Sequence, residues 1–276
     1  MRFVVVGRRG MFGSEMTHLL RSKGYEVIGF DRDSLNLDDS LEEISRKFLG
    51  FDVVINAVAY TAVDKAESEP EIANRINGEY AGKLAEATGM ASARFMHIST
   101  DYVFDGNSVT PYTTNDSPNP QGAYGRSKLL GEELVRSSGA DFTIFRTAWL
   151  YGANGRCFPK AMQERVANNE SLRVVNDQLG QPTWTKDLAM QVLEFSKLSR
   201  SPEIVHAVSS GKASWFDFAK EIVGDYEVAP VSSLEFVTAA RRPKFSVLDN
   251  SSEFVEPIGD WGERWKIAKA EVLKIS

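Results

Sequence analysis

The fold is decided by a stretch near the N-terminus, residues 2–13, which reads RFVVVGRRGMFG. A short apolar run is followed at once by three glycines in the spacing GxxGxxG. Glycines in this pattern allow a tight turn, close approach of the backbone to a pyrophosphate, and close packing of the next helix, whose amides face the anion. We therefore predict a strand, a dinucleotide-binding turn and a helix. The predicted cofactor contacts of this turn are Gly7, Arg9, Gly10, Met11, Phe12 and Gly13.

Apolar runs recur through the first half and alternate with segments of helical periodicity. Continuous apolar runs separated by helices are typical of a parallel sheet that is covered on both faces. The expected strands are residues 2–6, 25–30, 51–58, 94–98 and 141–146, and a helix is expected over residues 123–137. The fold class is therefore α/β, a Rossmann-like doubly wound parallel sheet.

The second half predicts helices near residues 159–168, 185–198, 214–223 and 261–273, with short, widely separated strands. This pattern indicates a smaller C-terminal lobe built from insertions. We predict an NAD(P)-binding Rossmann domain over residues 1–150, to which later segments return. Residues 151–276 are expected to form mainly a substrate-binding lobe.

Composition excludes several classes of protein. Of the 276 residues, 42% are hydrophobic and 25% are charged, which is typical of a globular chain. The net charge of −6 gives no overall attraction to nucleic acid or anionic lipid. The single cysteine forms no internal disulfide, and no stretch approaches the ~20 apolar residues of a spanning helix. The N-terminal apolar run is too short for a signal peptide. We expect a cytoplasmic protein with neither a membrane nor a nucleic-acid partner.

The second expected strand ends in an acidic residue that bears on the choice of cofactor. Asp31 lies about 20 residues after the glycine motif, where an acid binds the adenosine ribose hydroxyls of NAD. Arg8, Arg9 and Arg32 are close in sequence to the same point, and arginines hold the 2′-phosphate of NADP. The sequence leaves the choice between NADH and NADPH open, with Asp31 and Arg32 predicted to contact either.

Candidate catalytic residues lie where the fourth strand ends and the helix over residues 123–137 begins. Tyr124 and Lys128 are one turn apart on the same face of that helix. A phenol has a pKa near ~10, and a neighbouring ammonium favours its ionised form. Lys128 is also within reach of a cofactor ribose. Thr100 follows the strand and offers a hydroxyl to a substrate carbonyl, with Ser99 as the alternative.

The glycine motif, Thr100, Tyr124 and Lys128 together resemble an extended short-chain dehydrogenase/reductase. Longer motifs resemble the dTDP-4-dehydrorhamnose reductase family in particular. They are residues 54–67 (VINAVAYTAVDKAE), 99–106 (STDYVFDG), 145–152 (FRTAWLYG), 176–183 (NDQLGQPT) and 241–249 (RRPKFSVLD). The resemblance runs from Met1 to about Asn250 and then fades.

The resemblance implies that NADPH or NADH reduces the C4 ketone of dTDP-4-dehydro-L-rhamnose to dTDP-L-rhamnose, a step toward cell-surface polysaccharide. It implies that Tyr124 donates the proton, Lys128 assists Tyr124 and Thr100 orients the oxygen. It also places Asn77 in support of Lys128. The further cofactor contacts implied are Asn56, Ala57, Ala59 and Tyr60. By the same resemblance Asp101 and Tyr102 border the substrate. The further predicted substrate contacts are Arg242 at the diphosphate, Trp149 beside the sugar, and Gln178, Gln181 and Thr183 as polar contacts.

Two rival hypotheses stay open. One is a reductase or epimerase of another nucleotide sugar, because the sugar pocket is not legible in the sequence. The other is a noncatalytic regulatory subunit resembling the β subunit of methionine adenosyltransferase. The three histidines and Cys157 are assigned no role. Some relatives use an acid at the position of Glu15 in a magnesium-linked dimer, but partner acids are not evident, so no bound metal is predicted. The resemblance is compatible with a homodimer.

Overall fold

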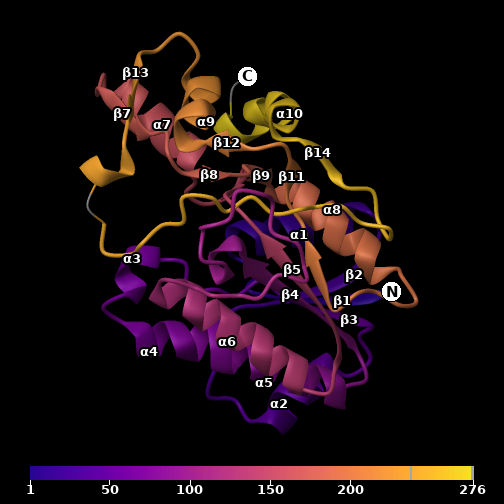
Figure 1. Cartoon of the computed structure of the whole chain (residues 1–276). Helices are drawn as coiled ribbons and strands as arrows, with labels where there is room; N and C mark the ends of the chain where they lie inside the picture. The colour runs from indigo at the N-terminus through magenta and orange to yellow at the C-terminus, as the bar shows by residue number, and fades with distance from the viewer. Residues whose placement is uncertain (237, 275–276) are drawn as a thin grey trace.

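The computed structural model describes residues 1–236 and 238–274. Its centre is a parallel sheet of six strands in the order β10-β5-β4-β3-β1-β2 (Figure 1). The strands are β1 (Arg2–Val6), β2 (Glu26–Phe30), β3 (Val53–Asn56), β4 (Arg94–Thr100), β5 (Asp141–Thr147) and β10 (Ile204–His206). Because all strands are parallel, their carboxyl ends meet at one edge, and chain order reverses at β1, which lies between β2 and β3. Ligands bind at such an edge in this class of sheet.

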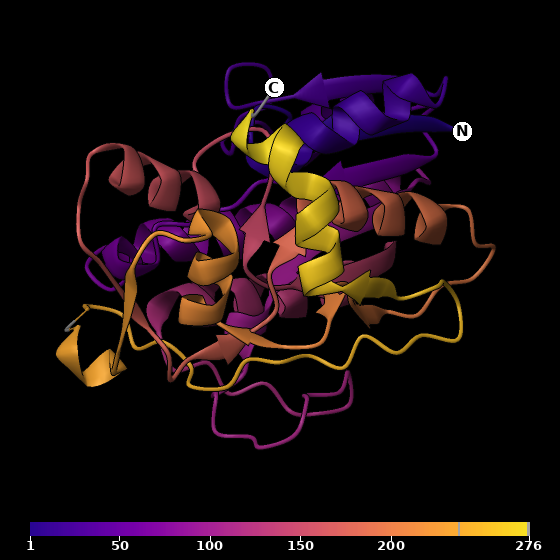
Figure 2. The same cartoon turned by 90° about the horizontal axis from the view of Figure 1, so that it is seen from above.

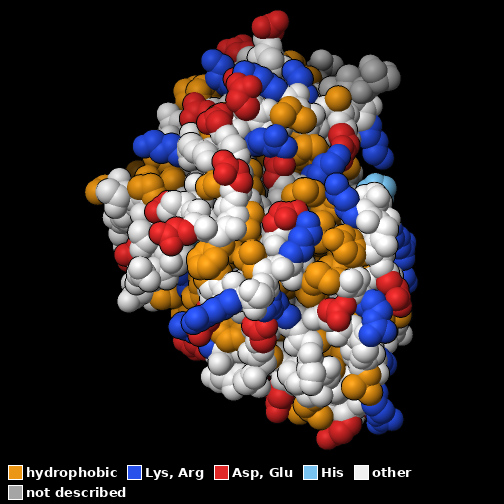
Figure 3. Space-filling view, turned by 90° about the vertical axis from the view of Figure 1, so that its right-hand side faces the viewer, with side chains coloured by type: hydrophobic (Ala, Val, Ile, Leu, Met, Phe, Trp, Pro, Cys, Tyr) orange, Lys and Arg blue, Asp and Glu red, His pale blue; other side chains and the backbone are white. Residues whose placement is uncertain are grey.

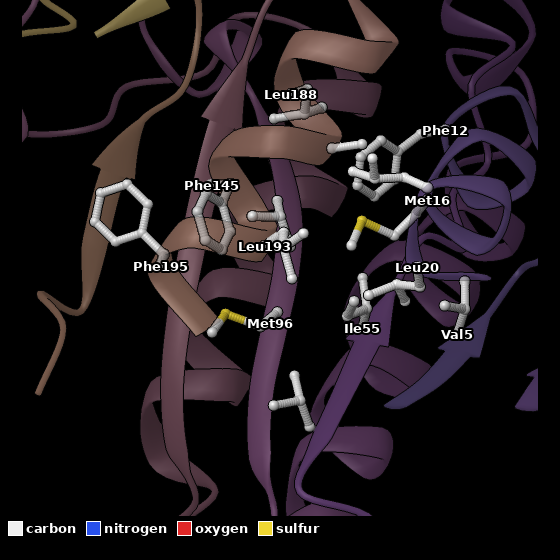
Figure 4. Packing of buried hydrophobic residues seen from close by; sticks show 14 of the residues in the cluster. Val5, Phe12, Met16, Leu20, Ile55, Met96, Phe145, Leu188, Leu193 and Phe195 are labelled. Carbon is white, nitrogen blue, oxygen red and sulfur yellow. The ribbon is translucent and has the colours of Figure 1, made fainter. Parts of the chain in front are cut away.

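Helices cover both faces of the sheet (Figure 1). One face carries α1 (Met11–Ser22) and α8 (Thr185–Ser196), and the other carries α2 (Leu41–Phe48), α5 (Tyr80–Met90) and α6 (Ala123–Ser137). Figure 4 shows the first of these cores, in which apolar side chains of α1 and α8 lie over the sheet. It includes Phe12, Met16 and Leu20 of α1, Leu188, Leu193 and Phe195 of α8, and Val5, Ile55, Met96 and Phe145 of the strands.

Short helical elements lie between the strands on the α6 side. They are α3 (Val63–Ala66), α4 (Pro70–Ala73), a π-helical turn (Asn74–Glu79) that runs into α5, and a 3₁₀ turn after β4 (Asp101–Val103). Residues 110–122 form a loop before α6, with a bridge between Tyr112 and Leu248.

The remaining elements form a lobe above the carboxyl edge of the sheet (Figures 1 and 2). It pairs its strands two by two around a core rich in aromatic residues, among them Tyr151, Phe218 and Trp265. Its elements are β6 (Leu150–Tyr151), α7 (Phe158–Ala167), β7 (Leu172–Val175), β8 (Leu179–Gly180), β9 (Thr183–Trp184), β11 (Ser209–Ser210), β12 (Ala213–Ser214), α9 (Trp215–Val223), β13 (Val228–Val231), a 3₁₀ turn (Ser233–Glu235), β14 (Ile258–Asp260) and α10 (Trp261–Leu273).

Helix α10, yellow in Figure 2, is linked by ion pairs to the first turn of α8. Ion pairs join Lys186 to Glu271 at 3.0 Å and Asp187 to Arg264 at 2.6 Å. The last helix therefore contacts α8, which covers the sheet, as well as the core of the lobe.

The predicted fold class is confirmed. The structure places strands at every expected strand position and helices at every expected helix position, within a few residues at each end. The strand β10 was missed because it has only three residues and lies in the second half of the chain, yet it forms an edge of the main sheet. Together with α8, it returns to the sheet from beyond residue 150.

The surface is mixed in charge. On the face in Figure 3, basic and acidic side chains lie interspersed among apolar and uncharged ones. In the described part of the chain, none of the helices combines the length and the apolar character needed to cross a membrane.

Candidate active site

The glycine turn is built by close backbone approach. Gly7 has a φ of +88°, and a Cβ there would lie 2.9 Å from the carbonyl carbon of Ala57. A Cβ on Gly13 would lie 2.2 Å from the carbonyl oxygen of Gly7. Gly10 stands at the N-terminus of α1, where no side chain caps the helix amides. Gly7 and Gly13 therefore have no room for a Cβ, and the open helix amides at Gly10 suit a phosphate group.

A cavity of about 450 Å³ opens at the carboxyl ends of β1, β2 and β3. The structure brings seven predicted cofactor residues together in its lining: Gly7, Arg9, Gly10, Asp31, Arg32, Ala57 and Ala59. Four other predicted cofactor residues do not line the cavity. Phe12 points into the core, Met11 is half-buried, Asn56 is buried behind the lining, and the Tyr60 hydroxyl donates to Glu69 at 3.1 Å.

The carboxylate of Asp31 is turned toward protein groups. Its Oδ2 atom accepts from Arg8 Nε at 3.0 Å and lies 3.0 Å from Arg9 Nε. Its Oδ1 atom accepts from the backbone amide of Asp33 at 3.2 Å. The hydrogen bond from Arg8 is the main cause that holds the pKa of Asp31 below its usual value. Asp31 is therefore paired with Arg8 and Arg9, and of these two arginines Arg9 lines the cavity.

Thr100 and Tyr124 come together at the end of β4. Thr100 Oγ1 donates to Asp101 Oδ1 at 2.9 Å and accepts from the amide of Tyr102. The rings of Tyr102 and Tyr124 meet edge to face, with centroids 5.6 Å apart. A Cβ on Gly125 would lie 2.2 Å from the carbonyl oxygen of Tyr102, so this glycine lets α6 approach closely. Burial and the charge of Asp101 raise the pKa of Tyr124 to about 12, and Thr100 opposes the rise.

Lys128 is buried on α6, and its amine points to β4. Its Nζ atom donates to the carbonyl oxygen of Ile98 at 2.7 Å and lies 3.3 Å from His97 Nε2. Burial lowers the pKa of Lys128 to about 8. The expectation that Lys128 lowers the pKa of Tyr124 is not met in this structure. The Lys128 amine contacts β4, and burial is the largest effect on the pKa of the Tyr124 phenol, which it raises.

A carboxylate from a distant segment caps the helix that carries Tyr124. The residue before α6 is Gly122, which has no capping side chain. Glu67 Oε1, at the end of α3, accepts a hydrogen bond of 2.7 Å from the amide of Ala123. A carboxylate at a helix N-terminus also interacts favourably with the helix dipole. Glu67 therefore fixes the first turn of α6.

This contact gives a first prediction. We expect Glu67→Ala to destabilise the protein by about 1 kcal/mol, the usual value of a lost N-cap, which lowers the midpoint of thermal unfolding by roughly 2–4 °C. Glu67→Gln keeps a carbonyl oxygen that accepts from Ala123 and is expected to retain most of the midpoint. Calorimetry checks both variants, and equal losses would contradict the capping role.

Asn77 supports the same helix from the π-helical turn. It is fully buried, accepts from the amide of Tyr60 at 2.8 Å and donates to Ser127 Oγ at 2.9 Å. Ser127 Oγ in turn donates to the carbonyl oxygen of Tyr124. This chain joins the loop after β3 to the helix that carries Tyr124 and Lys128.

Of the residues predicted to contact substrate, Asp101, Tyr102 and Trp149 lie near the end of β4 or at the lobe. Burial raises the pKa of Asp101 to about 6. Trp149 has a φ of +45°, rare for a residue with a Cβ. Its ring stacks on Trp215 of α9 with centroids 3.6 Å apart. This stack joins the end of β5 to the lobe.

Gln181 and Thr183 hold the backbone of the lobe. Gln181 Nε2 donates to the carbonyls of Ser209 and Leu248, and its Oε1 accepts from the amide of Leu248. Thr183 is fully buried, donates to Gln181 and accepts from Ser209. Because these polar atoms already have backbone partners, we leave both residues out of the substrate site proposed below.

Gln178 and Arg242 complete the predicted set. Gln178 is buried. Arg242 pairs with Asp64 of α3 at 2.7 Å, and a quarter of its side chain is exposed. This pair joins the segment around Arg242 to α3, one of the short helices beside the site.

A buried ion pair lies behind the site, and sequence reasoning missed it. Arg146 of β5 donates to Glu132 of α6 through Nη2 at 2.6 Å and through Nε at 3.0 Å. Ser99 donates to the same carboxylate. Ser99, the alternative hydroxyl, therefore points away from Tyr124, which leaves Thr100 as the hydroxyl on the tyrosine side.

Across residues 1–236 and 238–274, no three His, Cys, Asp or Glu side chains gather as a metal site would require. Glu15 is buried on α1, where burial and the charge of Glu271 raise its pKa while Lys186 lowers it.

Comparison with known proteins decides the family. The model of the RmlD substrate binding domain matches residues 1–275. The chain belongs to the dTDP-4-dehydrorhamnose reductase family. It is 38% identical to the dTDP-4-dehydrorhamnose reductase of Mycolicibacterium smegmatis, over 99% of this chain and 86% of that protein. The match to residue 275 also corrects the expectation that the resemblance fades after Asn250. The last helix carries no short motif, but its apolar side chains pack in the core of the lobe.

Solved structures in this family agree. A dTDP-4-dehydrorhamnose reductase of Clostridium acetobutylicum superimposes with a TM-score of 0.90 at 38% identity, covering 97% of this chain and 98% of that one. The Bacillus anthracis dTDP-4-dehydrorhamnose reductase, solved in complex with NADP, gives a TM-score of 0.93 at 32% identity, covering 98% and 99%. A nicotinamide cofactor fits the glycine cradle and cavity of the present chain.

Proposed function

We propose that this protein reduces the C4 ketone of dTDP-4-dehydro-L-rhamnose to dTDP-L-rhamnose with a reduced nicotinamide cofactor. The observation that carries the proposal is the contact of the Thr100 hydroxyl with Tyr124 at the carboxyl edge of the sheet. The dinucleotide cavity opens at the same edge. Family membership supports the substrate class.

The chemistry follows from the placement of the side chains. A bound reduced nicotinamide supplies the hydride for the ketone carbon. With its pKa raised to about 12, Tyr124 keeps its proton at neutral pH and donates it to the oxygen as negative charge develops there. Thr100 orients that oxygen with its hydroxyl, and Lys128 resupplies Tyr124.

We assign Asp101, Tyr102 and the Trp149 ring to the sugar and base side of the substrate. The family substrate carries a diphosphate, and we assign Arg242 as the cation that binds it. The Arg242 guanidinium is partly exposed, and it already forms charge-assisted hydrogen bonds with an anion, the carboxylate of Asp64. Gln178 is retained as a polar contact.

The test is absorbance at the reduced-nicotinamide band with purified protein and dTDP-4-dehydro-L-rhamnose, followed by product analysis. Oxidation of the cofactor with formation of dTDP-L-rhamnose supports the proposal. Turnover only with another nucleotide sugar favours a reductase or epimerase of that sugar. Cofactor binding without turnover of any sugar favours the regulatory-subunit hypothesis, against which the complete set of Thr100, Tyr124 and Lys128 argues.

Asp31 and its arginines favour NADPH as the cofactor. Arg9 lines the cavity and is 63% exposed, whereas both carboxylate oxygens of Asp31 have protein partners. We expect Arg9→Ala to reduce kcat/KM for NADPH by about 10–100-fold, the value of one or two hydrogen bonds to a charged group, and to change NADH far less. Arg156→Ala, at an exposed arginine of the lobe, is the matched control. An unchanged NADPH/NADH ratio in the Arg9 variant would refute the assignment.

Two finer points also belong to this proposal. We propose a cytoplasmic homodimer, in keeping with the family resemblance. Sedimentation equilibrium of the purified chain measures its mass directly, and a monomer at all concentrations would remove the dimer from the proposal.

A further inference from the structure

A fully buried histidine lies between the cofactor strands and the active-site lysine. His97 is the partner of Asn56 in the register of β4 with β3. Its Nδ1 atom is 3.1 Å from Asn56 Nδ2, and its Nε2 atom is 3.3 Å from Lys128 Nζ. The three side chains therefore form one hydrogen-bonded row beneath the site.

The orientation of the Asn56 amide fixes the proton on the imidazole. The backbone amide of Val58 donates to Asn56 Oδ1 at 3.0 Å, so the NH₂ group of Asn56 faces His97 and donates to Nδ1. A neutral imidazole has one acceptor and one donor nitrogen. Since Nδ1 accepts, the proton of the neutral ring is on Nε2. Complete burial and the neighbouring Lys128 hold the pKa of His97 well below its usual value, which keeps the ring neutral.

The Nε2–H group points at Lys128. An ammonium has only donors, whereas a neutral amine has a lone pair that accepts. Lys128 already donates to Ile98, so a donor from His97 favours the uncharged amine. Glu132, one turn further on α6, has the opposite effect because its charge favours the ammonium, and Arg146 is paired with it. Tyr124, one turn earlier on α6, is a further titratable group on the same face of the helix as this lysine.

We propose that His97, held by Asn56, is a positioning residue that sets the protonation of Lys128 and so readies it to pass a proton to Tyr124. The proposal rests on the reductase function. As Tyr124 gives its proton to the substrate oxygen, a proton of the Lys128 ammonium passes to the phenolate oxygen through an intervening water or hydroxyl group, because the amine itself contacts Ile98 and His97 of β4. The amine left behind accepts from His97 Nε2–H, and a proton from solvent restores the ammonium.

The tautomer can be observed without substrate. The chain has three histidines, so ¹⁵N-histidine labelling of the full protein gives few ring signals, and His97→Gln identifies the one sought. We expect His97 to show a bare Nδ1 and a protonated Nε2 throughout the neutral range. A bare Nε2, or a charged ring, would overturn the proposal. Because no turnover is needed, this result stands apart from success or failure of the proposed function.

The effect on Lys128 is measured by titrating its ¹³Cε resonance, assigned with Lys128→Arg. In the parent protein we expect a pKa of about 8. His97→Leu fills the space but removes the donor, and we expect the pKa of Lys128 to rise by roughly one unit, the value of one hydrogen bond. His97→Gln offers an amide N–H at the place of Nε2 and a carbonyl to Asn56, so it is expected to keep the pKa near the parent value.

The pH profile of kcat distinguishes the proposed role from a structural one, because replacing a histidine with only a structural role would not shift the pH profile. Activity falls as pH rises through the pKa of Lys128, because the proton that resupplies Tyr124 is lost. His97→Leu is expected to move this alkaline limb upward by roughly one pH unit, and His97→Gln to restore it. His18→Leu, on α1, is the control. An alkaline limb unchanged by His97→Leu would reject the proposal.

Discussion

Tyr124→Phe is expected to lower kcat by about 10²–10⁴-fold, the usual contribution of a positioned general acid, with little change in KM for the sugar. The variant removes one oxygen and keeps the ring that packs edge to face on Tyr102. Because the phenol is buried and holds its proton at neutral pH, solvent cannot readily replace it as the donor. Steady-state kinetics with the preferred cofactor measures both constants.

The matched control is Tyr226→Phe. It also removes a phenol hydroxyl, which donates to the backbone carbonyl of Glu170, but it lies in the lobe away from β4. We expect parent-like kinetics from it. If Tyr124→Phe kept more than about a tenth of kcat, far above the general-acid range, a second acid would be required. Asp101 is the nearest candidate, since burial raises its pKa to about 6 and its charge is felt at Tyr124.

The fold was predictable because its determinants are local. Residues 2–13 specify strand, turn and helix through apolar runs and glycine spacing, and the close contacts of Gly7 and Gly13 show why those glycines are needed. The helix over residues 123–137 was predicted with its observed bounds. The strand β10 could not be predicted in the same way, because three residues carry no usable periodicity and its place depends on pairing with β5.

The site was predictable only in part, because a contact between distant segments leaves no local pattern. Thr100, Tyr124 and Lys128 stand in motifs, whereas Glu67 and His97 act through partners that are far away in sequence. His97 was assigned no role because the three histidines are scattered in the sequence and the expected mechanism needs none of them. Its place three residues before Thr100, on the strand that ends at the site, is the signal that would have singled it out.

Asp31 shows that the position of a residue in the sequence does not specify its partners. The sequence places an acid at the ribose, but Arg8 and Arg9 on the glycine turn occupy its carboxylate. Gln181 and Thr183 likewise stand in a family motif, yet their side chains hold the backbone of the lobe. Residue type and spacing indicate which interactions a side chain can make, and the fold determines which partner it contacts.

The buried pair of Glu132 and Arg146 leads to the second large effect. Both side chains are 2% exposed, and the pair bridges α6 and β5 directly behind Thr100 and Lys128. We expect Arg146→Met to destabilise the protein by about 3–5 kcal/mol, because it leaves the carboxylate of Glu132 buried with only Ser99 as a partner. This is a large part of the ~5–15 kcal/mol that stabilises a typical domain.

The double variant Glu132→Leu with Arg146→Met separates the ion pair from simple loss of packing. Removing both charges removes the unpaired group, so we expect it to be more stable than Arg146→Met alone by at least about 2 kcal/mol, since apolar replacements of whole buried pairs are often neutral. Urea denaturation measures the parent and the variants. If Arg146→Met does not fold, recovery of soluble, cooperative protein in the double variant carries the same information. The exposed pair of Lys186 and Glu271 is the control, with a coupling below about 1 kcal/mol. Strictly additive losses at Glu132 and Arg146 would mean that the pair does not act as a unit.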